Sequence, residues 1–196
     1  MDYEHLLIFG GVCVATWFAV IYFWPRMLLY VYKRALLVRG FGDGPIPVNT
    51  LHTEPQTLFA DPLHPPASAS KLATTGVNRD TLPTVGWLDL SKGPLVLQVP
   101  DMAGRYYGVQ FTDPSNNTIF AYVGKRTTGT EAGEYLVSGP GWKGTMPQGM
   151  TQISSPNNSV LVLGRVFVES DSDLSTAYNL AKRIQLTPQS RWRQGQ

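Results

Sequence analysis

Three consecutive polar residues, Asn78, Arg79 and Asp80, form the densest cluster in this sequence that could do chemistry. They precede an apolar run that predicts a strand, so the guanidinium and the carboxylate would lie together where that strand begins. An arginine and a carboxylate in this position can bind a polar ligand, or they can pair with each other and hold loop carbonyls. We favour the structural role, because such ion pairs are common structural devices, and keep ligand binding as the alternative.

Five further residues are candidates for a polar or aromatic pocket: Tyr106, Tyr107, Arg126, Trp142 and Arg165. Side chains alternate between the two faces of a strand, so one of the adjacent tyrosines is expected in the core and the other on the surface. The other three residue types are also typical of packing at strand ends. Together with residues 78–80 they make a candidate ligand site or a structural polar cluster.

The usual catalytic arrangements are missing from the sequence. His5, His52 and His64 lie far apart, and none shares a helical turn with another histidine. There is no phosphate-binding glycine loop followed by Lys-Ser or Lys-Thr, and no Gly-x-Ser-x-Gly motif. The single cysteine, Cys13, lies in an apolar run, which argues against a thiol nucleophile. We expect no metal and no cofactor, and the sequence favours a protein that is not an enzyme.

The elements that would carry these residues begin with an apolar run from Leu6 to Pro25, twenty residues without a charge. As a helix this run would be about 30 Å long, which matches the hydrocarbon core of a bilayer. It lacks the basic start and the small-residue cleavage site of a signal peptide. The sequence therefore predicts a transmembrane anchor with a basic flank over residues 1–39.

Basic residues follow this run and none precedes it. Residues 1–39 carry the whole net charge of +2, because Arg26, Lys33, Arg34 and Arg39 lie there and the rest of the chain is neutral. The positive-inside rule then places the C-terminal domain on the cytoplasmic side, held to the headgroups by the basic flank. A neutral domain argues against nucleic acid as a partner.

One pattern favours the opposite side of the membrane. The triplets that begin at Asn116 and Asn157 fit the glycosylation acceptor pattern, which matters only in a secretory lumen. A periplasmic or lumenal domain is therefore the alternative to the cytoplasmic one.

After the anchor, residues 40–70 are predicted as a proline-rich extended arm, since proline disfavours helices and central strands. From residue 71 on, apolar runs alternate with glycine and proline turns, and strands are expected over 85–90, 95–99, 106–111, 119–123, 134–138, 149–153 and 160–168. The last run is apolar on both faces, so we expect it in the middle of a sheet. One amphipathic helix should follow and end before Pro188. This pattern predicts an all-β fold, an antiparallel sandwich or barrel over 71–196, with one C-terminal helix.

Several runs resemble a known family, among them TGVNRDTL, VPDMAGRYYGVQFTDP and ISSPNNSVLVLGRVFV. With the tail DLSTAYNLAKRIQLTPQSRW they make residues 71–192 similar to the domain of unknown function numbered 1254. The resemblance implies a jelly-roll-like β-sandwich, places the chain among the small integral membrane members, and implies no secure activity. Larger members add a second domain numbered 1214, which we expect this chain to lack. The family usually has a tyrosine where this chain has Pro83, so a ligand site that used that tyrosine would be altered here.

These features favour a membrane-anchored, non-enzymatic structural subunit that tethers a β-sandwich to a larger membrane-associated assembly. A minor capsid-type protein at the inner membrane of a virion is one form of this hypothesis, based on analogy of fold. The alternatives are an envelope small-molecule-binding protein or an enzyme of unknown reaction, and a partner subunit for a separately encoded 1214-type domain. The expected partners are the lipid bilayer and other protein subunits.

Overall fold

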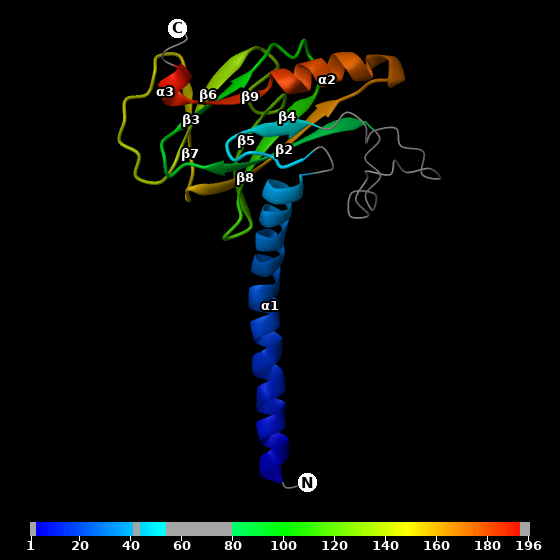
Figure 1. Ribbon diagram of the computed structural model, residues 1–196, viewed down its shortest axis with the longest axis vertical. Helices are drawn as coiled ribbons and strands as arrows, with labels where there is room; N and C mark the ends of the chain where they lie inside the picture. The colour runs from blue at the N-terminus through cyan, green and yellow to red at the C-terminus, as the bar shows by residue number, and fades with distance from the viewer. Residues whose placement is uncertain (1–2, 41–43, 54–79, 193–196) are drawn as a thin grey trace.

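A computed structural model describes residues 3–40, 44–53 and 80–192, and it places a two-sheet β-domain at the end of one long helix (Figure 1). The helix, α1 (Tyr3–Arg39), has 37 residues and is therefore about 55 Å long. It continues through Pro25, and the Arg26 guanidinium folds back to donate to the carbonyl of Tyr22 at 2.7 Å. The helix is longer than the predicted run and reaches the expected end of the basic flank.

A left-handed glycine ends α1. Gly40 has a φ of +61°, and its amide donates to the carbonyls of Ala35 and Leu36, both at 3.1 Å. A Cβ at Gly40 would lie 1.8 Å from the carbonyl oxygen of Gly44, so only glycine fits. The chain therefore turns back sharply toward the helix that it has just left.

The β-domain consists of two sheets. Sheet A has the order β1-β2-β8-β4-β5, and sheet B has the order β7-β6-β3-β9. The strands of sheet A, all antiparallel, are β1 (Leu51–Thr53), β2 (Thr81–Asp89), β8 (Ser159–Phe167), β4 (Tyr107–Asp113) and β5 (Thr118–Gly124). Those of sheet B are β7 (Thr151–Ser154), β6 (Gly133–Ser138), β3 (Leu95–Val99) and β9 (Gln185–Pro188). The prediction that the last apolar run is central is confirmed, because β8 lies between β2 and β4.

The core lies between the inner faces of the two sheets. Leu82, Phe111 and Val162 from sheet A pack with Leu97 and Val137 from sheet B, and all five are fully buried. After a short 3-10 turn (Asp171–Asp173), helix α2 (Leu174–Arg183) packs its small buried residues against the same core. Alternation of apolar side chains along each strand thus directs one face of each sheet inward.

Three features differ from the sequence prediction. Strands β6 and β7 are parallel, so the fold is not purely antiparallel. A parallel pair needs a connection of about a dozen residues to return the chain to the end of the sheet where the first strand began, and residues 139–150 supply one. Two short strands, β1 and β9, were not expected; β1 lies within the arm, as an edge strand. A second C-terminal helix, α3 (Gln189–Trp192), follows Pro188 where only one helix was expected, since proline is tolerated where a helix begins.

Pro83 also lies in a strand, although the strand was expected to begin at Val85. It pairs with Arg165 of β8, whereas β1 reaches only as far as Thr84 on the other side. Among the described residues, β2 therefore has no strand partner on that side at this position, and proline is tolerated at such an edge.

Candidate functional site

The C-terminal end of α1 packs on the outer face of sheet A. Leu36 of the helix and Ile46 of the returning chain form a buried cluster with Val85, Trp87 and Leu161. We call these five residues the helix dock. The amide of Ile46 also donates to the carbonyl of Leu36 at 3.3 Å. The helix and the β-domain are therefore joined by apolar packing as well as by the chain.

One of the four predicted flank cations belongs to the edge of this dock. The Lys33 ammonium donates to Ser159 Oγ at 3.3 Å and lies 5.0 Å from the ring centroid of Trp87. Ser159 Oγ also accepts the indole N–H of Trp87 at 2.8 Å. Arg34 and Arg39, by contrast, are exposed. Lys33 thus contacts the domain, whereas Arg34 and Arg39 do not lie in the buried dock.

Three of the predicted site residues meet elsewhere on the outer face of sheet A. The hydroxyl of Tyr106 lies 3.4 Å from that of Tyr122, and the guanidinium of Arg126 lies 5.7 Å from the Tyr106 ring centroid. Arg165 donates from Nη1 to Thr81 Oγ1 at 3.2 Å. We call Tyr106, Tyr122, Arg126 and Arg165 the tyrosine–arginine cluster.

Tyr122, which the sequence analysis missed, lies at the centre of this cluster. Burial and the hydrogen bond with Tyr106 raise the pKa of Tyr122 to about 12, against the opposing charges of Arg126 and Arg165. Its ring crosses Gly108, where a Cβ would lie 1.8 Å from the Tyr122 hydroxyl oxygen. The absence of a side chain at position 108 therefore makes room for the tyrosine.

The cluster is a surface of hydrogen-bond donors. Within the part of the chain that the structure describes, neither Arg126 nor Arg165 has a carboxylate partner. Guanidinium groups only donate, and the raised pKa of Tyr122 keeps its hydroxyl protonated at neutral pH. This arrangement can bind an anionic oxygen group, but it offers no base or nucleophile for covalent chemistry at neutral pH.

The other predicted residues lie apart from this cluster. Tyr107 points to the opposite face of β4 and is fully buried in the core, as alternation predicts for one of the two tyrosines. Trp142 packs on the outer face of sheet B. Asp80 is exposed just before β2, and Asn78 and Arg79 lie outside the described residues. Sequence spacing alone therefore grouped residues that belong to separate surfaces.

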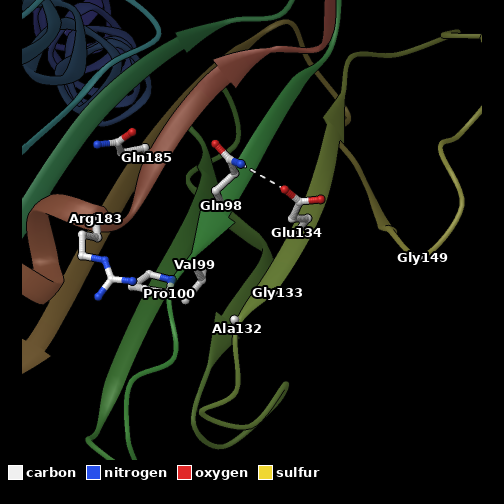
Figure 2. Close-up of a pocket in the computed structure, with 9 residues that line it drawn as sticks. All are labelled: Gln98, Val99, Pro100, Ala132, Gly133, Glu134, Gly149, Arg183 and Gln185. Carbon is white, nitrogen blue, oxygen red and sulfur yellow. Dashed lines mark hydrogen bonds between the residues drawn. The ribbon is translucent and has the colours of Figure 1, made fainter. Parts of the chain in front are cut away.

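A second candidate site is a hollow of about 620 Å³ on the outer face of sheet B, which no sequence pattern predicted (Figure 2). Glu134 Oε1 accepts hydrogen bonds from Gln98 Nε2 at 3.0 Å and from the indole N–H of Trp192 at 2.9 Å. Arg183 and Gln185 line the hollow from the side of α2 and β9. Among the described residues, no group of three histidine, cysteine or acidic side chains could hold a metal ion.

Both predicted glycosylation acceptors take part in a hydrogen-bond network around the buried carboxylate of Asp113. Asp113, at the end of β4, accepts the side-chain amides of Asn116 at 3.0 Å and Asn157 at 2.8 Å. Its other carboxylate oxygen accepts the backbone N–H of Ser115 at 2.9 Å. The two asparagines thus have a structural role, because they tie the β4–β5 turn to the loop before β8.

Fold and site together define a protein of two packed β-sheets with an N-terminal helix long and apolar enough to cross a membrane. The chain belongs to the DUF1254 family, described as a protein of unknown function, whose family model matches residues 60–188. The resemblance noted from the sequence is thereby confirmed at the level of the family. No curated protein matches the sequence.

Two solved structures are similar to this chain. The VPA0106 protein from Vibrio parahaemolyticus has a TM-score of 0.63 and 24% identity, over 87% of this chain and 37% of its own. An uncharacterised protein from Burkholderia cenocepacia has a TM-score of 0.37 and 15% identity, over 61% of this chain and 31% of its own. The first shows a shared fold, and this chain spans little more than a third of that protein's length.

Proposed function

We propose that this chain is a single-pass membrane protein in which α1 anchors a non-enzymatic β-domain to a larger membrane-associated assembly. The observation that carries the proposal is the exposure of α1: the most apolar 18-residue window of the helix is not buried at all against the domain. Trp17 and Phe18, for example, are 63% and 62% exposed. A core helix of a soluble protein would bury such side chains, so the surroundings that suit this helix are lipid.

The helix dock joins the end of the proposed anchor to the β-domain. Leu36 and Ile46 are only 2% and 3% exposed, so the end of α1 is part of the folded domain. A chain cut after Pro25 would keep both residues, so what speaks against cleavage is that the apolar run ends in Trp24-Pro25-Arg26 and lacks the small-residue cleavage site of a signal peptide. We therefore infer that the span is uncleaved and, from the basic residues that follow it, that the domain lies on the cytoplasmic side.

The edge strands of the two sheets, as far as the structure describes the chain, support a role in assembly. β5 is an edge strand of sheet A and β7 an edge strand of sheet B, and such edges can pair with another chain. The Vibrio protein uses this fold for only 37% of its length. We propose that a partner polypeptide, such as a 1214-type domain, pairs with one of these edges. The jelly-roll topology and the capsid-type form of the hypothesis remain predictions.

Charged substitutions within the span test the anchor. The ten Leu, Ile, Phe and Val residues between Leu6 and Pro25 contribute about −3 to −6 kcal/mol to insertion, whereas an arginine near the centre costs about 2.5–3.5 kcal/mol. Val14→Arg/Phe18→Arg should therefore make insertion unfavourable by about 0 to 5 kcal/mol, and the chain should leave alkaline-washed membranes. Val38→Arg/Val48→Arg adds the same charge outside the span and should stay bound. A wild-type chain that washes off would refute the anchor.

The hollow on sheet B favours a second candidate function, an envelope protein that binds a small molecule. Its volume of about 620 Å³ suits a small ligand, and Glu134, Gln98 and Arg183 supply a few polar groups around it. Screening the purified chain against small polar metabolites tests this, with Glu134→Gln as the variant that should lose binding. Binding that survives this substitution would place the ligand elsewhere.

A further inference from the structure

We infer that the tyrosine–arginine cluster binds the phosphate group of an anionic phospholipid headgroup. This inference rests on the proposed membrane anchor, because a headgroup reaches the cluster only if α1 spans a bilayer. It adds a specific lipid contact on the β-domain to a helix that would otherwise hold the domain alone.

The cluster lies on the same face of sheet A as the helix dock. Leu161 of the dock and Arg165 of the cluster are both in β8, four residues apart, so their side chains point to the same face about 13 Å from each other. In Figure 1, β2 and β8 lie directly above the end of α1, and α2 lies on the far side of the domain. The outer face of sheet A therefore faces the bilayer that α1 would span.

The length of α1 beyond Pro25 places this face near the headgroups. Lys33, at the edge of the dock, is eight residues after Pro25, which is about 12 Å along the helix. The headgroup layer extends about 5–8 Å beyond the hydrocarbon core. Met27 and Leu28 are exposed on the intervening turns, as expected for a helix surface in the apolar part of this layer. Arginine side chains can cross the remaining gap of a few ångströms with their long stems.

The chemistry of the cluster suits a phosphate. Arginine binds phosphate oxygens through two parallel N–H donors, and neither Arg126 nor Arg165 is neutralised by a carboxylate of the described chain. The hydroxyls of Tyr106 and Tyr122 lie 3.4 Å apart and share a hydrogen bond, so one donates to the other and the second keeps its O–H for a phosphate oxygen. The raised pKa of Tyr122 keeps the Tyr122 hydroxyl protonated.

Lipid retention tests the inference on the full chain. We would reconstitute it in nanodiscs of equimolar phosphatidylcholine and phosphatidylglycerol and use native mass spectrometry to count the lipids that stay bound on release. Wild-type protein should retain phosphatidylglycerol preferentially. Arg126→Gln/Arg165→Gln should reduce this preference about 25-fold, since each basic group near an anionic leaflet contributes about fivefold. The matched control, Lys143→Gln/Lys182→Gln, removes the same charge from exposed residues outside the cluster and should leave the preference unchanged.

Three outcomes would overturn the inference: no preference in the wild type, equal preference in the cluster variant, or an equal loss in the control. Circular dichroism of each variant separates loss of the site from loss of the fold. Addition of excess glycerol phosphate distinguishes a lipid ligand from a soluble phosphate. If the preference for phosphatidylglycerol is abolished, the site belongs to a soluble ligand. If the preference survives, the result supports the lipid. Failure of the chain to enter nanodiscs would instead refute the anchor, so the two proposals fail separately.

Discussion

Truncation of Leu36 should release the end of α1 from the β-domain. Leu36 is 2% exposed within the helix dock, and replacement of a buried leucine by alanine costs about 2–5 kcal/mol. Even the lower value raises the population of the undocked state about 30-fold. Alanine is a better helix former than leucine, so the substitution does not weaken the helix itself. The expected loss is therefore confined to the contact between helix and domain.

Tryptic cleavage of the full chain in nanodiscs measures this opening at Lys33 and Arg34. When the dock recloses faster than trypsin cuts, the cleavage rate follows the open population, so Leu36→Ala should be cut about 30 times faster than the wild type. Val38→Ala is the matched control, because Val38 is on the same helix but 60% exposed, and its rate should be unchanged. Equal rates for the two variants would show that the dock does not hold the helix.

Three further predictions concern the β-domain. Burial alone would raise the pKa of Asp113, but the hydrogen bonds that its carboxylate accepts outweigh burial, so the pKa is lowered. The stabilisation from this carboxylate should be present above about pH 4 and be lost as the pH falls through the folded-state pKa. Asp113→Asn removes the titrating group, so the unfolding midpoint of the variant should depend less on pH in the acid range. Carbon NMR of the tyrosine rings should show Tyr122 titrating near pH 12. Gly108→Ala should displace the Tyr122 ring and lower the pKa of Tyr122. An unchanged titration in this variant would contradict the packing of the ring over Gly108. Arg105 donates to Asp173 at 2.7 Å, so Arg105→Gln should cost about 1.5–3 kcal/mol in denaturant unfolding, and an unchanged midpoint would show that the pair contributes nothing.

Patterns within single segments predicted much of the fold. The run from Leu95 to Val99 is a strand with the predicted bounds, and the apolar run that became β8 is central as expected. These predictions succeed because periodicity and burial on both faces are properties of one segment. The same holds for the apolar part of α1, whose composition alone separates it from the rest of the chain.

Contacts between segments could not be predicted in the same way. Tyr122 meets Tyr106 because the β4–β5 register brings its ring across Gly108, and no periodicity within either strand reports that register. The helix dock likewise joins Leu36 to Trp87, far apart in the chain. Trp142 was grouped with the arginines on residue type, whereas in the fold it packs on the outer face of the other sheet.

The intact mass of the chain recovered from alkaline-washed membranes tests the central claim most directly. If α1 is a retained anchor tied to the β-domain, the washed membranes should hold the chain with Leu6–Pro25 still attached, and the supernatant should hold none. A mature chain that begins after Arg26, or a full chain found only in the supernatant, would contradict it.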